Sequence, residues 1–335
     1  MNLDEMVELS VKHNAVDLHL CSGHLPYWRR QGRLEAIPQQ AVLSADWMAQ
    51  FMARWLSDPQ CQELASTGQL DFALSLACGQ RLRANLFKQR NGLSLALRII
   101  ASVCPTLESL QLPAIVPTLL TQQDGLILVT GATGSGKSTT LAALVDALNG
   151  QQARHIITLE DPIEFIHHSQ QSLIQQREIG LHCSSFAQGI KAALREDPDV
   201  ILLGELRDSD TIRQALTAAE TGHLVLATLH TRGAAQAVDR LVDVFPAEEK
   251  HLVRTQLAGS LKAVIAQKLV PSAAGSRIGL FELLIATPGI KNLIREGKMH
   301  QIPAMLQTGA QAGMQTFEQS RLARQADGLI KPEGQ

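Results

Sequence analysis

The sequence is 335 residues long, which suggests two domains of ordinary size. Its hydrophobic content of 45% provides for a sizeable buried core. The formal net charge is −2 and aromatic residues make up 4%, so a generally basic, base-stacking nucleic-acid surface is not indicated. We therefore expect no nucleic-acid partner, although these totals do not address a local basic patch.

The five cysteines are scattered and form no C-x-x-C pair, so neither a disulfide framework nor a zinc module is indicated. The first residues, MNLDEMVELSVKHN, carry three acids and no long apolar core, unlike a signal peptide. No apolar run approaches the roughly 18 residues that a membrane span needs. We expect a cytoplasmic protein without direct membrane insertion, linked to any membrane through a partner.

Residues 1–100 predict a small α+β domain. Strand-like runs at 70–76, 81–88 and 93–100 end it, and Asn91-Gly92 is a strong hairpin signal between the last two. Residues 101–117 contain three prolines and little periodicity, and we expect a linker there.

Residues 118–330 show a different pattern, in which apolar runs alternate with helical periodicity. This is typical of a parallel sheet with helices on both faces. Strands are expected at 126–130, 155–159, 200–203, 224–228 and 278–284. Helices are expected at 137–149, 185–196, 209–221 and 233–243, and three more after residue 287 form a C-terminal cap.

The stretch GLILVTGATGSGKSTT, residues 125–140, fills every fixed position of G-x-x-x-x-G-K-[ST] between a strand and a helix. Glycines let successive N–H groups point at one anion, and the helix start adds a positive dipole end. Lys137 is expected at the β- and γ-phosphates, and the Ser138 hydroxyl at Mg²⁺. The predicted ATP-binding residues are Gly131, Ala132, Thr133, Gly134, Ser135, Gly136, Lys137, Ser138 and Thr139.

Three polar positions follow later strands, whose carboxyl ends face the ligand crevice of a parallel sheet. Glu164, in ITLEDPIEF, is predicted to orient or activate the attacking water, although a solvated acidic turn is the alternative. Glu205 ends an apolar strand like that of a Walker B motif, with Gly204 where Asp is usual. Glu205 is therefore expected to polarise water or to hold Mg²⁺ through a water. His230 is expected to contact the γ-phosphate. A lone histidine is more often a structural residue, so this indication is weak by itself.

These blocks together resemble the type II/IV secretion ATPase superfamily, and most closely the PilT-type retraction ATPases of type IV pili. The matching segments are the GATGSGKST loop, ITLEDPIEF, ALREDPDVILLGELRD and TAAETGHLVLATLHT. The last three are similar to the family's Asp box, Walker B motif and His box. Further similarity in DLHL, VDVFPAEEK and TPGIKNLIRE extends the resemblance over nearly the whole chain.

The resemblance implies an α/β fold with a RecA-like P-loop NTPase core and a smaller N-terminal PAS-like α+β domain. It also implies an Mg²⁺-dependent ATPase that forms a hexamer at the cytoplasmic face of the inner membrane. A membrane platform protein of a pilus or secretion system would be its partner. In this comparison Glu164 and Glu205 match the family's catalytic glutamates, and His230 its His-box histidine.

Arg83 and Arg98 match family arginines that reach the nucleotide phosphates when the two domains close. Such an arginine would stabilise charge on the transferred phosphoryl group. A surface salt bridge is the alternative for each, and the nearby Arg81 and Arg90 leave the choice among the arginines open.

The absence of paired cysteines and of extra N-terminal domains favours the retraction-like branch of the family. Gly289 and Lys291 stand where the family's C-terminal motif has Ala and Arg, and lysine cannot reproduce bidentate arginine contacts. ATP hydrolysis is therefore a firmer expectation than pilus retraction. Two alternatives remain at this point: a regulatory ring subunit that binds ATP with little turnover, and a nucleic-acid translocase.

Overall fold

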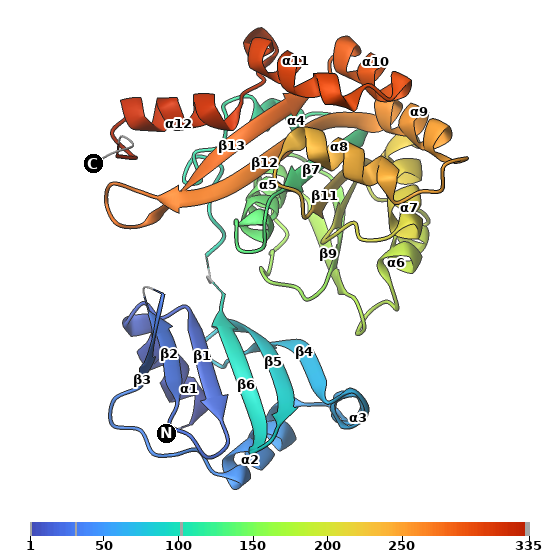
Figure 1. The fold of residues 1–335 in the computed structure, drawn as a ribbon. Helices are drawn as coiled ribbons and strands as arrows, with labels where there is room; N and C mark the ends of the chain where they lie inside the picture. Colours follow the sequence, from blue (N-terminus) through green and yellow to red (C-terminus); the bar gives the residue numbers. More distant parts are fainter. Residues whose placement is uncertain (1, 31, 101–102, 332–335) are drawn as a thin grey trace. The chain divides into compact units, whose positions relative to one another are not determined.

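The computed structural model describes residues 2–30, 32–100 and 103–331. It divides into an N-terminal unit, Met1–Val103 with Pro162–Ile166, and a C-terminal unit, Cys104–Asp161 with His167–Gln335 (Figure 1). Residues 1 and 31 of the predicted domain and residues 101 and 102 of the predicted linker lie outside the described residues. The boundaries 1–100, 101–117 and 118–330 stay predictions.

The N-terminal unit is an antiparallel sheet with helices packed on one face. The strand order is β3-β2-β1-β6-β5-β4. Leucines on alternate positions of β5 and β6 pack against α1, α2 and α3 in a single core. The elements are α1 (Leu3–Lys12), β1 (Asp17–Cys21), β2 (Tyr27–Arg30), β3 (Arg33–Ala36), α2 (Ala45–Trp55), α3 (Asp58–Thr67), β4 (Gln69–Ser75), β5 (Arg81–Gln89) and β6 (Gly92–Ile99).

The C-terminal unit holds the alternating strands and helices that the sequence predicts. Its strands are β7 (Gly125–Thr130), β8 (His155–Glu160), β9 (Leu173–Glu178), β10 (Val200–Leu203), β11 (Leu224–Leu229), β12 (Leu261–Pro271) and β13 (Arg277–Ile285). Its helices are α4 (Val116–Leu119), α5 (Lys137–Gln151), α6 (Phe186–Ala193), α7 (Ser209–Glu220), α8 (Ala234–Asp243), α9 (Lys250–Ser260), α10 (Pro288–Glu296), α11 (Ile302–Thr308) and α12 (Phe317–Ala326), with short 3₁₀ turns η1 (Met299–Gln301) and η2 (Ala310–Ala312).

Seven strands form one sheet in the order β13-β12-β7-β11-β10-β8-β9. All neighbours are parallel except β13, which pairs antiparallel with β12. The carboxyl ends of β7, β8, β10 and β11 therefore meet at one edge of the sheet. The residues directly after these four ends are the ones in which the sequence predicts phosphate binding and catalysis.

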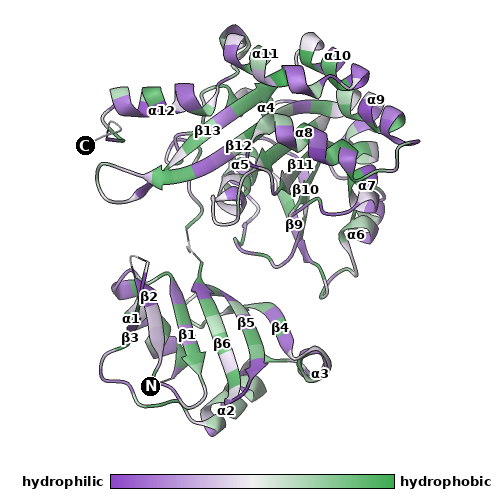
Figure 2. Cartoon of the chain, viewed as in Figure 1, coloured by the Kyte–Doolittle hydropathy of each residue, from purple (hydrophilic) through white to green (hydrophobic). Residues whose placement is uncertain are grey.

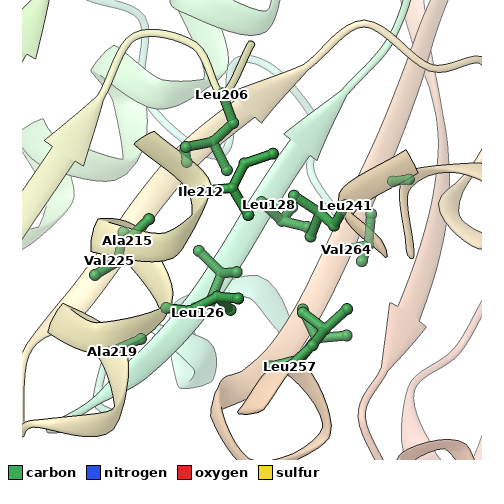
Figure 3. Packing of buried hydrophobic residues seen from close by; sticks show 14 of the residues in the cluster. Leu126, Leu128, Leu206, Ile212, Ala215, Ala219, Val225, Leu241, Leu257 and Val264 are labelled. Carbon is green, nitrogen blue, oxygen red and sulfur yellow. The ribbon is translucent and has the colours of Figure 1, made fainter. Parts of the chain in front are cut away.

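Both faces of this sheet are buried, which explains the continuous apolar strands β10 and β11 (Figure 2). Along β7, Leu126 and Leu128 point to one face and Ile127 and Val129 to the other. The first pair packs with residues of α7, α8 and α9, as Figure 3 shows for Ile212, Leu241 and Leu257. The second pair packs with α4 and α5. The predicted α/β class with a smaller α+β unit is confirmed.

Two strands are absent from the sequence prediction. β9 follows the segment ITLEDPIEF as an edge strand with an irregular burial pattern. β12 follows α9 directly, with Leu261 as the C-cap residue of the helix and the first residue of the strand. No residue separates the two elements, and Gly259 lies inside the last turn of α9 rather than after it, so the end of the helix is poorly marked in the sequence.

Within the described ranges, no helix combines the length and the apolar character that crossing a membrane requires.

Asn149, fully buried near the end of α5, connects that helix to the segment before β9. Its Nδ2 donates to the carbonyl of His168 at 2.8 Å, and its Oδ1 accepts from the amide of Gln170 at 2.9 Å. Asn149→Ala leaves both groups without these partners, so we expect a loss of about 1–3 kcal/mol in unfolding free energy. Urea unfolding followed by circular dichroism measures it.

The control is Asn292→Ala, which removes only an exposed hydrogen bond to Glu296. We expect it to change stability by less than about 0.5 kcal/mol. Equal losses in the two variants would contradict the role given to Asn149.

Candidate nucleotide-binding site

The loop after β7 depends on glycines whose backbone other residues cannot adopt without strain. Gly134 and Gly136 have φ of 76° and 91°, in the left-handed region. Position 131 has no room for a side chain, because a Cβ there would lie 2.4 Å from the carbonyl oxygen of Gln267. The motif glycines are therefore required by the shape of this loop.

Lys137, the first residue of α5, folds its side chain back over the loop. Its Nζ donates to the carbonyls of Gly131 at 2.9 Å and Ala132 at 3.1 Å, and the residue is 8% exposed. A nearly buried ammonium needs such partners, because desolvating it alone is costly. The same group would serve phosphate oxygens placed in the loop.

Several groups of the loop are suited to an anion. In the described part of the chain, no protein acceptor receives the N–H of Gly134 or Gly136. The Ser135 hydroxyl oxygen is also buried and has no hydrogen-bond partner there. The first N–H groups of α5 have no intrahelical acceptor. These unsatisfied donors fit a phosphate group.

A chain of side chains leads from Lys137 across the carboxyl ends of two further strands. His230 follows β11, and its Nδ1 lies 3.5 Å from Lys137 Nζ. Its Nε2 lies 3.3 Å from Oε1 of Glu205, which follows β10. The other oxygen of Glu205 accepts from Arg207 at 2.7 Å. The structure thus brings together three of the predicted site residues, Lys137, Glu205 and His230.

The geometry assigns the tautomer of His230. An ammonium has only donors, so Nδ1 facing Lys137 acts as the acceptor. In the neutral imidazole that fits this contact, Nε2 carries the proton and faces Glu205. His230 is placed here by a hydroxyl clamp: Thr130 Oγ1, at the end of β7, lies 2.9 Å from the carbonyl and 3.1 Å from the amide of Thr231.

Glu205 stays ionised in this setting. Burial alone would raise its pKa, but the hydrogen bond from Arg207 and the adjacent His230 outweigh burial and lower it below the ordinary glutamate value. Both carboxylate oxygens are occupied, one by each partner. The backbone around it is tied to β11, because the hydroxyl of Thr228 donates to the carbonyl of Gly204.

The three remaining catalytic candidates, Arg83, Arg98 and Glu164, lie in the N-terminal unit. Arg83 and Arg98 are directly opposite each other on β5 and β6, on the face away from the helices. Like charges at such a position repel, and each has an acidic partner. Arg98 contacts Asp17 at 2.9 Å, and Arg83 lies 3.5 Å from Glu164 of the Pro162–Ile166 segment. The carbonyl of Ile163 accepts from Arg81.

A cavity of about 440 Å³ opens beside the loop within the C-terminal unit. Ser135, Gly136 and Thr139 form one wall, and the β12–β13 hairpin forms another. Gln111 and Leu329 close it from the two ends of the unit's sequence. Its lining combines apolar and polar groups, as small-molecule sites do.

Gln267, Thr130 and Thr231 were not among the predicted site residues, and Arg207, which follows the Walker B-like strand, was a second-tier candidate among the arginines. Thr130 and Thr231 belong to the motif segments, so their proximity to predicted residues was a signal that could have found them. Gln267 is on the unpredicted strand β12, and no motif marks it.

The Glu205–Arg207 pair predicts a titration effect. Arg207→Met removes the hydrogen bond and the charge that lower the Glu205 pKa, so we expect that pKa to rise. Carboxyl ¹³C NMR titration of glutamate-labelled protein measures it, with Glu205→Gln identifying the resonance. Arg240→Met, an exposed substitution on α8, should leave the pKa of Glu205 unchanged. An unchanged titration in Arg207→Met would show that Arg207 does not stabilise the carboxylate.

Comparison with known proteins gives the family. The family described as "Type II/IV secretion system protein" matches residues 68–279. The chain is 62% identical over 330 residues to "Uncharacterized protein YggR" of Escherichia coli, covering 98% of this chain and 100% of that protein. It is 44% identical over 333 residues to "Type IV pilus retractation ATPase PilT" of Pseudomonas aeruginosa, covering 99% and 96%.

Among solved structures, the chain is similar to the crystal structure of the pilus retraction motor PilT with bound ADP. The TM-score is 0.90 at 40% identity, over 99% of this chain and 95% of that one. The RecA-like ATPase core with a smaller N-terminal domain is thereby confirmed, as is the predicted nucleotide-binding class. The chain belongs to the type II/IV secretion system protein family, in which it is a PilT-like ATPase.

Proposed function

We propose that this ATPase is the Mg²⁺-dependent, hexameric motor of a type IV pilus or a related secretion platform, acting in the retraction direction. The observation that carries the proposal is the loop after β7. There a nearly buried ammonium lies beside loop amides for which the described residues supply no acceptor, and both kinds of group suit a phosphate. The relatives named for pilus retraction supply the biological setting.

ATP would be held at two places. Lys137 and the loop amides would take the β- and γ-phosphates, exchanging the carbonyls of Gly131 and Ala132 for phosphate oxygens. The adjoining cavity would take the base and ribose, since it begins at Ser135 and Thr139 and is large enough for them. ADP in the similar solved structure agrees with this class of ligand.

The side chains around the phosphates would share the work of hydrolysis. Glu164 would orient or activate the attacking water, and Arg83 and Arg98 would reach the phosphates when the two units close. Glu205 would stabilise the site as an anion held by Arg207 and His230. His230, hydrogen-bonded toward both Lys137 and Glu205, is suited to respond to the γ-phosphate.

Mg²⁺ would be held at this site mainly by the phosphates of the nucleotide. In the part of the chain that the structure describes, no three His, Cys, Asp or Glu side chains gather into a metal site. Ser138, in the first turn of α5, would supply a hydroxyl ligand, and Glu205 would act through a water. The ion would neutralise charge that develops on the β- and γ-phosphates.

The partner we propose is a platform protein of the inner membrane, with the ATPase peripheral to it on the cytoplasmic side. The family description and the pilus relatives support this partner class. A secretion platform is the second member of that class, since the same family includes secretion proteins.

A ring subunit that binds ATP with little turnover is a second candidate. The observation in its favour is that both oxygens of Glu205 are engaged and Glu164 lies near Arg83. Comparing a single turnover with steady-state hydrolysis separates the two functions. A motor hydrolyses ATP in both regimes, whereas a regulatory subunit binds ATP and hydrolyses little of it in either.

Lys137→Ala should reduce ATP hydrolysis about a hundredfold or more, because it removes the charge nearest the phosphates. Steady-state phosphate release by the purified full chain measures it. Lys298→Ala, whose partner is the exposed Glu296, is the matched control and should retain full activity. Turnover at the unsubstituted rate in Lys137→Ala would refute the proposed function.

Removing the metal tests the second part of the proposal. With EDTA in excess, ATP hydrolysis should stop, and added Mg²⁺ should restore it. Ser138→Ala should require more Mg²⁺ for half-maximal activity, because a ligand is lost. Thr118→Ala, an exposed hydroxyl on α4, should titrate like the unsubstituted protein. Hydrolysis that continues in EDTA would rule out the metal dependence.

A further inference from the structure

The strand β12 continues past its neighbour at the phosphate loop. Its last pair with β7 is Ala266 with Thr130, after which β7 ends and the loop begins. The next residue, Gln267, still pairs with Phe281 of β13 and is 4% exposed. A polar side chain is thus buried where the loop leaves the sheet, and a buried amide needs partners.

The amide of Gln267 bonds to both sides of the loop. Its Nε2 donates to the carbonyl of Ser135 at 2.7 Å. Its Oε1 accepts from the hydroxyl of Thr140, in the first turn of α5, at 2.8 Å. One side chain therefore fixes the end of the loop to the start of the helix.

The bond to Ser135 sets the direction of the next amide. In a trans peptide the carbonyl and the following N–H point in opposite directions. Because the Ser135 carbonyl is held toward β12, the N–H of Gly136 points away from the strand. Among the described residues no protein acceptor receives that N–H.

Gln267 also shapes the loop by contact. A Cβ at Gly131 would lie 2.4 Å from its carbonyl oxygen, and one at Gly136 would lie 3.2 Å from its Nε2. Two of the three glycines at 131, 134 and 136 thus border this residue. The loop takes its shape against Gln267 as well as from its own sequence.

We propose that Gln267 is a positioning residue: by holding the Ser135 carbonyl, it aims the Gly136 N–H at the nucleotide phosphate. This inference rests on the proposed function, in which the loop binds ATP. Gln267 acts through the loop and does not touch the reacting atoms. Without it, the 135–136 peptide is free to rotate, and the entropy lost when phosphate orders that peptide weakens binding.

The test is ADP binding by calorimetry to the full chain. Gln267→Met keeps the volume and loses both hydrogen bonds, and we expect about tenfold weaker ADP binding. Inorganic pyrophosphate, which would contact the loop but not the base cavity, should lose affinity by the same factor. Thr140→Val removes only the bond to Oε1 and should change ADP affinity by less than about threefold.

Two further measurements separate positioning from general damage. On ADP binding, the Gly136 amide resonance should move strongly in the unsubstituted protein and weakly in Gln267→Met. Gln267→Asn withdraws the amide by one methylene and should repeat the Met result, which keeps the test valid if one variant misfolds. Gln256→Met, whose partner is the exposed Glu220, is the control and should bind normally.

The outcomes are distinct. If the unsubstituted protein does not bind ADP, the proposed function itself fails. If it binds ADP and folded Gln267 variants bind equally well, the positioning role is overturned. Equal losses in Thr140→Val and Gln267→Met would also overturn it, because the Ser135 bond would then not be the cause.

Discussion

The central constraint in this structure is the nearly buried ammonium of Lys137. A charge removed from water must be compensated locally, and here two loop carbonyls compensate it. Those carbonyls turn inward only because the loop follows a tight path that glycines permit. The loop in turn needs a fixed strand end before it and a fixed helix start after it. The buried sheet provides the strand end and α5 provides the helix start, and in this way the fold holds the Lys137 ammonium in place.

The parallel sheet explains why residues far apart in the sequence meet at that charge. His230 follows β11 and Glu205 follows β10, which are the first and second strands beside β7. Strands in register end at one edge, so the first residues beyond them are neighbours. The separation of about 90 residues between Lys137 and His230 then becomes 3.5 Å. The small hydroxyl clamp between Thr130 and Thr231 fixes the final position.

Sequence analysis predicted the parts of this arrangement that local signals encode. The loop has a fixed spacing, its flanking strand and helix have their own periods, and Asn91-Gly92 marks the β5–β6 hairpin that the structure contains. β12 was missed because it follows α9 directly at Leu261, with no connecting residue to mark where the helix ends and the strand begins. The role of Gln267 was missed with it, since nothing in LKAVIAQKLVP distinguishes a buried glutamine that bonds to a loop from a glutamine at the surface. The contact between Glu205 and His230 depends on strand order, which periodicity does not give.

The site behaves as a connected unit because of how protons are arranged in it. Lys137 has only donors, so the histidine nitrogen facing it carries no proton, and the other nitrogen carries one toward Glu205. Glu205 is ionised and holds Arg207 with its second oxygen. Any anion that draws the ammonium of Lys137 away from His230 changes the first contact of this chain. Two contacts, His230 with Glu205 and Glu205 with Arg207, connect that position to Arg207.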